Sequence, residues 1–286
     1  MSPDRVTSGA QRRNRLELRR LAWTGVAGLL SLTTILPLAW ILVTALRTTR
    51  EVSRDPLGLP STPIWQNFID AWTTADFGRL FLNSTVVAVG TVVGVLLLAG
   101  IAAYAFAILP LPGRTPLYVL FVAGLIIPVG LLVLPLFYQM RALGLLNTTW
   151  ALILPQVAIS LPFAIVLLRA FMADIPREIL DAARVDGAGP WRLFTSMVLP
   201  LIRPAILALI VFDVIWSWNQ FLLPLILTQD PRAHTLPLGL SFFMGRYAVD
   251  FPRLMAGATI SLIPTIIIFV LFQRHMIRGI TAGAFK

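Results

Sequence analysis

Long apolar runs alternate with short polar segments along this chain. The apolar runs cover 21–46, 82–108, 117–140, 150–170, 203–227 and 253–274. Each is close to or above the roughly 20 residues that a helix needs to cross the hydrocarbon of a bilayer. The first run is too long for the core of a signal peptide, and no small-residue cleavage site follows it at the expected distance. The pattern therefore predicts an all-α membrane protein with six transmembrane helices, the first of which is retained.

Composition supports the membrane assignment. Hydrophobic residues make up 57% of the chain and charged residues 13%, a balance that a soluble domain of this length could not hide from water. Cysteine is absent, so a disulfide framework and a thiolate metal site are both excluded. We expect a basic N-terminal arm at 1–20 and a single transmembrane domain at 21–286, because no internal repeat divides the chain.

The arginines predict how the chain is oriented. With the N-terminus inside, fifteen of the 23 Lys and Arg residues flank the spans on the cytoplasmic side. This excess predicts cytoplasmic N- and C-termini in a bacterial plasma membrane. The net charge of +10 is then explained by topology and contact with anionic lipids. The basic residues cluster at helix ends without interleaved aromatic residues, which argues against nucleic-acid binding.

The segment between the fourth and fifth runs has the pattern of a helix, a glycine break and a second helix. Asp174 and Pro176 suit the first turn of a helix, and Gly187 can take the left-handed conformation that ends one. Gly189-Pro190 restarts the chain, and apolar residues follow on one helical face until Pro200, where we expect the helix to end. The segment is predicted to form a hairpin at the cytoplasmic surface.

The chain lacks the residues with which it could supply its own energy. A Walker-type phosphate loop needs a lysine after its glycines, and the sole lysine is Lys286. Ion-driven transporters place several ionisable groups within the bilayer, whereas the predicted spans contain one clear candidate, Asp213. Neither histidine lies in a span, and no H-E-x-x-H motif or pair of embedded carboxylates is present. The chain is therefore predicted not to be an enzyme.

The hairpin segment resembles a motif of one transporter family. Permease subunits of binding-protein-dependent ABC importers, of the carbohydrate type related to the maltose permease, carry E-A-A, three residues, G, nine residues, I, one residue and L-P. The matching positions here are Asp181, Ala182, Ala183, Gly187, Met197, Leu199 and Pro200. Asp181 replaces glutamate and Met197 replaces isoleucine, which keeps the charge and the approximate volume.

Further segments resemble the same family in order and spacing. They are Asn83-Ser84, Ala102 to Phe106, Ile175-Pro176, Trp218 to Phe221, and the ending from Gln273 to Ala284. The tail Thr281–Lys286 resembles one that reaches the ATPase interface in relatives. Gly90 and Gly94, four residues apart in the second span, are interpreted as a helix-packing motif.

The resemblance implies that the hairpin enters a cleft on a cytoplasmic ATPase and transmits its closure to the membrane helices. Trp191 and Phe194 are then the apolar anchors, and the charged residues set the register. The predicted docking residues are Asp181, Ala182, Ala183, Arg184, Asp186, Gly187, Trp191, Phe194, Met197, Leu199 and Pro200. Without the resemblance, the residues fit a surface hairpin that merely joins two spans.

The resemblance also implies the partners and the function. We expect a homologous second permease, two ATP-binding subunits that hold ATP and Mg, an extracellular or periplasmic solute-binding protein and membrane lipids, with no cofactor in this chain. The predicted function is to form half of the pathway of a sugar importer. Alternatives are the same machinery for a sugar phosphate or peptide, or a secondary carrier or membrane scaffold.

Span five carries a polar cluster whose role the sequence leaves open. Its candidates for the substrate path are Asp213, Trp218, Asn219 and Gln220. Amides and aromatic rings suit a sugar, but amides in membranes also join helices, and the same two interpretations apply to Gln139, Gln156 and Ser160. Asp213 is alternatively a partner for an arginine of a neighbouring helix.

Overall fold

Helices make up nearly all of the secondary structure. The computed structural model describes residues 4–245 and 249–284, with side chains described for 23–245 and 249–272. Within these residues there is no strand, and four helices are long and apolar enough to cross a membrane. The number rises to six if each of two bent helix pairs counts as one span. A helical membrane protein is thus confirmed, with four to six candidate spans.

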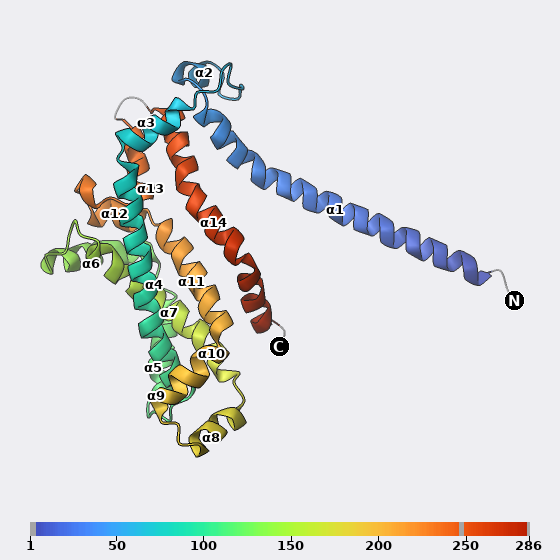
Figure 1. Cartoon of the computed structure of the whole chain (residues 1–286), viewed down its shortest axis with the longest axis vertical. Coiled ribbons are helices and arrows are strands. Elements are labelled where there is room, and N and C mark those ends of the chain that lie inside the picture. Colours follow the sequence, from blue (N-terminus) through green and yellow to red (C-terminus); the bar gives the residue numbers. More distant parts are fainter. Residues whose placement is uncertain (1–3, 246–248, 285–286) are drawn as a thin grey trace.

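Five long helices carry most of the structure (Figure 1). They are α1 (Asp4–Ala45), α4 (Phe77–Ala107), α7 (Trp150–Ala173), α11 (Arg203–Trp218) and α14 (Phe251–Ala284). The shorter helices are α2 (Thr49–Arg54), α3 (Gln66–Thr74), α5 (Arg114–Gly124), α6 (Val129–Ala142), α8 (Arg177–Val185), α9 (Pro190–Leu193), α10 (Leu199–Leu201), α12 (Leu222–Leu227) and α13 (Leu236–Gly239). The end of the bundle with α2 and α3 is called the α3 end, and the opposite end with α8 and α9 the hairpin end.

The centre of the bundle is the packing of α4 against α7. A Cβ atom on Gly90 would lie 2.7 Å from Cδ1 of Ile153, and one on Gly94 would lie 2.7 Å from Cγ2 of Val157. Only glycine permits so close an approach of two helices, which confirms the packing interpretation of this pair. α11 packs against both α4 and α7, so these three helices form the core.

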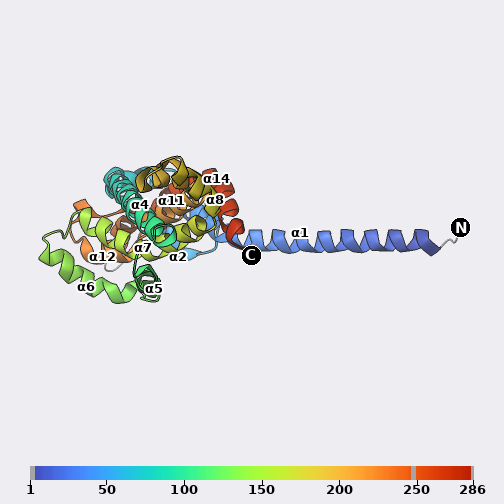
Figure 2. The ribbon, with the colours of Figure 1, turned by 90° about the horizontal axis from the view of Figure 1, so that it is seen from below.

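α1 extends away from this core. Figures 1 and 2 show it projecting from the bundle as a straight arm. The apolar segment Trp23–Ala45 is long enough to cross a membrane, and its most apolar window is not buried against other described residues. The end of α1 packs against α14, and the apolar surface that no described residue covers must be covered by lipid or by another chain.

The predicted span 117–140 is two helices in the structure. α5 and α6 meet at an angle of 100° across a break at 125–128. Pro128 sits at this break with extended backbone angles (φ −64°, ψ 132°). It lacks the N–H that would continue the helix, and it disfavours helical geometry in the residue before it. The predicted span is therefore a sharply bent pair of helices that together qualify as one candidate span.

The predicted span 203–227 also ends early. α11 stops at Trp218, and α12 begins again at Leu222. Asn219 terminates α11, because both its backbone N–H (3.2 Å) and its side-chain amide (2.8 Å) donate to the carbonyl oxygen of Ile215. A polar side chain that competes for a backbone carbonyl in this way favours the end of a helix.

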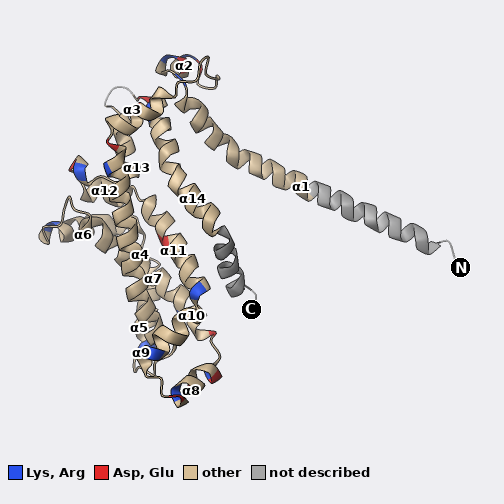
Figure 3. Cartoon of the chain, in the orientation of Figure 1, with Lys and Arg blue, Asp and Glu red and all other residues tan. Residues whose placement is uncertain are grey.

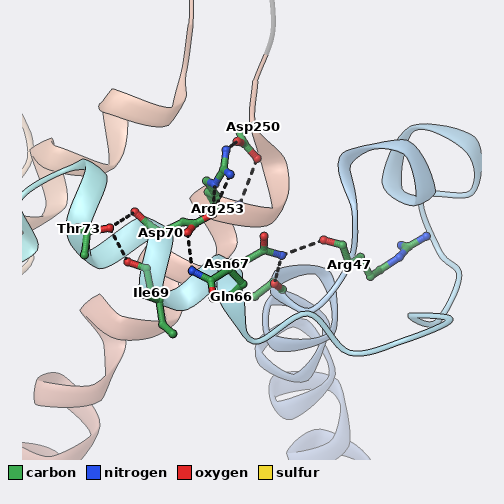
Figure 4. A network of polar contacts seen from close by, with 9 residues as sticks. Arg47, Gln66, Asn67, Ile69, Asp70, Thr73, Asp250 and Arg253 are labelled. Carbon is green, nitrogen blue, oxygen red and sulfur yellow. Dashed lines mark hydrogen bonds and ion pairs between the residues drawn. The ribbon is translucent and has the colours of Figure 1, made fainter.

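Charged residues lie mostly at the two ends of the bundle, as Figure 3 shows. At the α3 end, Arg47 is 1% exposed and donates to the carbonyl oxygens of Glu51 (2.9 Å), Asp55 (2.5 Å) and Pro56 (3.3 Å). Asn67 donates to the carbonyl oxygens of Ala45 (2.8 Å) and Arg47 (2.9 Å) (Figure 4). These bonds fix the segment between α1 and α3 to the end of α1.

A second set of contacts ties α3 to α14. Arg253 forms ion pairs with Asp70 and Asp250, each at 2.8 Å (Figure 4). A hydrogen bond from Gln66, followed by those from Arg253, lowers the pKa of Asp70 below its ordinary value. Hydrogen bonds from Ser61 and Thr48 likewise lower the pKa of Glu51 to about 2. Both carboxylates therefore stay ionised near neutral pH.

Replacing Arg47 with methionine should loosen the segment that Arg47 holds. The change removes the charged donor from three carbonyl oxygens, two of which keep a backbone N–H donor, and hydrogen bonds to charged groups contribute about 1.5–3 kcal/mol each. We expect hydrogen-exchange protection of residues 48–64 to fall roughly tenfold or more, since about 1.4 kcal/mol corresponds to a factor of ten. Arg50→Met, at an exposed position nearby, is the control, and equal exchange in the two variants would contradict the role of Arg47.

Candidate functional site

The first helix of the hairpin is α8. It follows Pro176 and ends at Gly187, whose φ of +79° lies in the left-handed region. The N–H of Gly187 donates to the carbonyl of Arg184 (3.0 Å), and the N–H of Ala188 donates to that of Ala183 (2.9 Å). These two bonds form a Schellman motif. The predicted helix with a glycine stop is confirmed.

The two faces of α8 have different environments. Leu180 and Ala183 are buried against the rest of the chain, whereas Ile179 and Val185 are exposed. Asp181 pairs with Arg184 at 2.7 Å on the exposed side of the helix. An exposed pair at this spacing contributes little stability, so both side chains remain accessible to a partner.

The second helix of the hairpin does not end at Pro200. α9 continues through a wide turn at Phe194–Val198 into α10, which contains Pro200. In that turn the N–H of Leu199 donates to the carbonyl of Phe194, five residues back. The widened turn lets the chain pass a proline without an ordinary helical bond. The helix therefore ends at Leu201, one residue after the predicted stop at Pro200, and the chain bends by 76° into α11.

Phe194 belongs to the chain's own core. Its side chain is 6% exposed, and its ring centroid lies 4.9 Å from that of Tyr104. The hydroxyl of Tyr104 donates to the carbonyl oxygen of Pro190 (2.9 Å). The prediction that Phe194 anchors a partner is contradicted, because its ring already packs against α4. Trp191, by contrast, is 68% exposed.

Tyr104 therefore attaches the second helix of the hairpin to α4, a role that the sequence analysis did not predict. The signal was present in the small residues around it, since Ala102, Ala103 and Ala105 leave room for another helix to approach. Gly100, one turn earlier, adds to that room, because a Cβ there would lie 3.7 Å from Cζ of Phe194. α4 and the hairpin are thereby held together at the hairpin end.

A groove runs between α8 and the second helix. It has a volume of about 530 Å³ and is lined by Glu178, Ile179, Ala182, Ala183, Asp186, Ala188, Arg192, Ser196 and Met197. Among the predicted docking residues, Ala182, Ala183, Asp186 and Met197 meet here. Asp181 and Arg184 lie instead on the other side of α8, beside a second hollow of about 730 Å³ that includes Tyr104 and Leu193. Leu199 is half-buried and Pro200 exposed, at the start of the bend.

A separate polar cluster is buried among α4, α7 and α11. Gln156 and Asp213 are both 0% exposed, and Ser160, Ser217 and Thr91 are also buried. The hydroxyl of Ser217 donates to Oε1 of Gln156 (2.5 Å), and that of Thr91 approaches the same oxygen (3.5 Å). Within the described residues, neither carboxyl oxygen of Asp213 nor Nε2 of Gln156 has a hydrogen-bond partner. The suggested arginine partner of Asp213 is not found there.

The other candidates of span five make contacts within the chain. Trp218 is 5% exposed, and its indole N–H donates to the carbonyl oxygen of Ser261 in α14 (3.3 Å). Its ring meets that of Phe81 edge-on, with centroids 5.2 Å apart. Asn219 is exposed and Gln220 half-buried. The geometry favours the interhelical interpretation for Trp218, and the substrate path stays a prediction.

The predicted ATPase-directed tail, Thr281–Lys286, lies in the segment 273–286 whose side chains the structure does not describe. Phe285 and Lys286 lie outside the described residues. No group of three or more His, Cys, Asp or Glu residues suited to a metal ion occurs in the described part of the chain.

A helical protein with several apolar spans and an exposed helical hairpin between two of them belongs to the class of multi-span membrane transport components. Comparison with known proteins then identifies the family. Residues 96–282 match the family described as binding-protein-dependent transport system inner membrane component. The chain belongs to this family and is a permease component of such a system.

Curated relatives match almost the whole chain. The diacetylchitobiose uptake system permease protein NgcG of Streptomyces coelicolor is 36% identical over 258 residues, covering 90% of this chain and 85% of that protein. The arabinooligosaccharides transport system permease protein AraQ of Halalkalibacterium halodurans is 35% identical, covering 88% and 91%. The trehalose transport system permease protein SugB of Mycobacterium tuberculosis is also 35% identical, covering 88% and 92%.

A solved structure agrees in fold. A chain of a bacterial ABC transporter involved in the import of the acidic polysaccharide alginate superposes with a TM-score of 0.79 at 20% identity, covering 90% of this chain and 96% of that chain. At this identity the likeness establishes the fold, which is that of an ABC importer permease.

Gly187 and Gly189 offer a matched pair of substitutions. A Cβ on either would meet no atom within 4 Å, but only Gly187 has a positive φ. We expect Gly187→Ala to weaken the hairpin by about 1 kcal/mol, because an L side chain is strained in this conformation. Gly189→Ala, at φ −67°, should be neutral or slightly stabilising. Hydrogen exchange of the α8 amides measures both, and similar losses would argue against the Schellman stop.

Trp218→Ala should reduce the yield of folded protein. The change removes the contact with Phe81 and the hydrogen bond to α14, and truncating a buried tryptophan costs about 3–5 kcal/mol. The control is Trp150→Ala, because Trp150 is an exposed tryptophan at the start of α7. Normal folding of the Trp218 variant with selective loss of solute uptake would instead assign Trp218 to the substrate path.

Proposed function

We propose that this chain forms half of the translocation pathway of an ATP-driven carbohydrate importer and couples to a separate ATPase through the hairpin α8–α10. The observation that carries the coupling proposal is the continuity of the hairpin with α11. The groove lies between α8 and the second helix, and that second helix carries the buried Phe194 and connects to α11 through the bend at Ile202. A force applied at the hairpin would therefore reach α11 through this connection.

The contacts of the hairpin suit such a transmission. The accessible groups for a partner are the apolar ring of Trp191, the small residue Ala182 in the groove, and the charges of Asp186 and Arg192 at its rim. Behind them, the Tyr104 hydrogen bond and the Phe194 ring contact fix the second helix to α4. Trp191 is now the proposed aromatic anchor, since an exposed ring can fill a partner's pocket.

We further propose the topology that this function requires. The hairpin end faces the cytoplasm, both termini are cytoplasmic, and each bent helix pair acts as one span, which gives six. Residues 1–20 form a basic arm and 21–286 a single transmembrane domain in the bacterial plasma membrane. The bent pairs support this count, because each pair is long and apolar enough to cross a membrane when its two helices are taken together.

The partners follow from the surfaces that the chain leaves uncovered. The uncovered α1 supports a second, homologous permease as its neighbour, since one apolar arm of this length needs an apolar partner or lipid. The hairpin groove supports an ATPase, of which such an importer has two, and these subunits would bind ATP and Mg. A solute-binding protein would dock at the α3 end. In this arrangement the chain itself holds no cofactor and catalyses no reaction.

The relatives support a carbohydrate as the solute. Those already named are described for diacetylchitobiose, arabinooligosaccharides and trehalose. A second candidate is a small polar solute of another type, because a 37% identical relative from Synechocystis is described as an osmoprotective compounds uptake permease protein, GgtD. Binding of candidate sugars and compatible solutes to the cognate solute-binding protein decides between them.

Trp191→Ala should weaken the coupling between the permease and the ATPase, so that the loaded binding protein stimulates ATP hydrolysis less. We expect the variant to insert and fold normally, because Trp191 is exposed, while hydrolysis stimulated by the solute-loaded binding protein falls roughly tenfold or more, as for a central interface anchor. The measurement is ATP turnover of the reconstituted complex with and without loaded binding protein.

Two further variants serve as controls for the Trp191→Ala measurement. Trp150→Ala removes an equally accessible tryptophan far from the hairpin and should retain stimulation. Phe194→Leu should lower folded yield, since Phe194 packs inside the chain. Full stimulation of the Trp191 variant would contradict docking through the exposed face of the hairpin.

A further inference from the structure

Asp213 is a carboxyl group buried in the apolar part of the bundle. It lies on α11 with no exposed surface, and neither of its oxygens has a hydrogen-bond partner in the described residues. An isolated carboxylate in such a place costs many kcal/mol unless it is paired or neutralised. The position therefore demands a neutralising partner.

Among the described side chains, no positive group reaches it from the helices packed around it. α11 packs against α4, α7, α10 and α14. No charged residue occurs from 80 to 107, from 150 to 168, from 199 to 202 or from 254 to 273. Arg203 precedes Asp213 by ten residues on α11, and Arg169 follows Ser160 by nine residues on α7, so each is roughly 14–15 Å away along its helix. The Arg169 guanidinium lies over the Tyr118 ring. Tyr104, the remaining titratable group facing inward on α4, is bonded to Pro190.

The groups that do face Asp213 are neutral and include an unused donor. Ser160 on α7 approaches the carboxyl, and Ser217 lies one turn further along α11, where it donates to Gln156. The Nε2 group of Gln156 is buried without an acceptor. The i, i+4 pairs Gln156/Ser160 and Asp213/Ser217 thus oppose one another across the interface of α7 and α11.

We propose that Asp213 is a proton-binding site within the membrane, and that its neutral carboxyl group joins α11 to α7 through Gln156, Ser160 and Ser217. The proton comes from water and adds to one carboxylate oxygen, which becomes a hydroxyl donor. The other oxygen remains an acceptor for the amide of Gln156, directly or through one bridging water. Every polar group of the cluster then has a partner without any buried net charge.

This site shares no residue with the lining of the docking groove. Its function is to keep α11 attached to α7 when the hairpin moves, so Asp213 is a positioning residue. A sodium ion is the rival occupant, since the cluster is rich in oxygen atoms. The free Nε2 group of Gln156 favours a protonated carboxyl group instead, because its N–H groups donate hydrogen bonds and cannot ligate a cation.

Infrared spectroscopy of the reconstituted complex tests the proton directly. We expect wild-type protein at neutral pH to show the C=O stretch of a protonated carboxyl group, and Asp213→Asn to lack it. Asp76→Asn, which removes an exposed carboxylate, is the control and should leave that band unchanged. Absence of a band that depends on Asp213 would overturn the proposal.

ATP turnover of the reconstituted complex gives the second readout. Asp213→Asn supplies a neutral group of the same shape, so ATP turnover should stay within about twofold of wild type, whereas Asp213→Val should lose roughly tenfold or more because Gln156 and Ser160 lose their partner. A tenfold loss in the Asn variant would overturn the neutral-acid assignment. Sodium-dependent turnover that disappears in the Asn variant would replace the proton with sodium. The infrared result does not depend on the solute or on docking, so failure of the proposed function would leave it interpretable.

Discussion

The structure depends on the absence of water from the hydrocarbon layer. Backbone N–H and C=O groups there must be bonded within the protein, and two interruptions of helices in the described residues come with such bonds. At the end of α11 the Asn219 side chain adds a second hydrogen bond to the Ile215 carbonyl. Before Pro200, a wide turn provides a bond from Leu199 to Phe194. These bonds accompany the changes of direction at the two ends of α11.

These bends determine how the hairpin is connected. α9 and α10 are fastened to α4 through Tyr104 and Phe194, and the same stretch of helix turns at Ile202 into α11. α11 is in turn fixed to α14 by Trp218. These contacts connect the hairpin to both α4 and α11, and the proposed coupling to an ATPase needs such a connection.

Local signals in the sequence were sufficient for the hairpin and the long helices. Gly187 ends α8 because its conformation is a property of the residue and its neighbours, and apolar length identifies a span without knowledge of its partners. The break at Pro128 could not be distinguished in this way, since Pro135, Pro155 and Pro162 lie inside helices. Which aromatic residue of the hairpin turns inward was equally hidden. Trp191 and Phe194 lie on one face in the sequence pattern, and only the position of Tyr104 shows that Phe194 is buried.

Carboxyl groups of this chain lie in two different settings, one beside water at the α3 end and one inside the bundle. The difference between them limits how the protein can be driven. At the α3 end Asp70 and Asp250 share Arg253, so each carboxylate has a cationic partner beside water. Asp213 sits where no such cation is within reach among the described side chains, and proton transfer through a membrane needs a succession of ionisable groups. The predicted spans offer no second acidic residue at its level. A single neutral acid can hold helices together but cannot relay protons across the bilayer, which agrees with the proposal that the driving force enters through the hairpin.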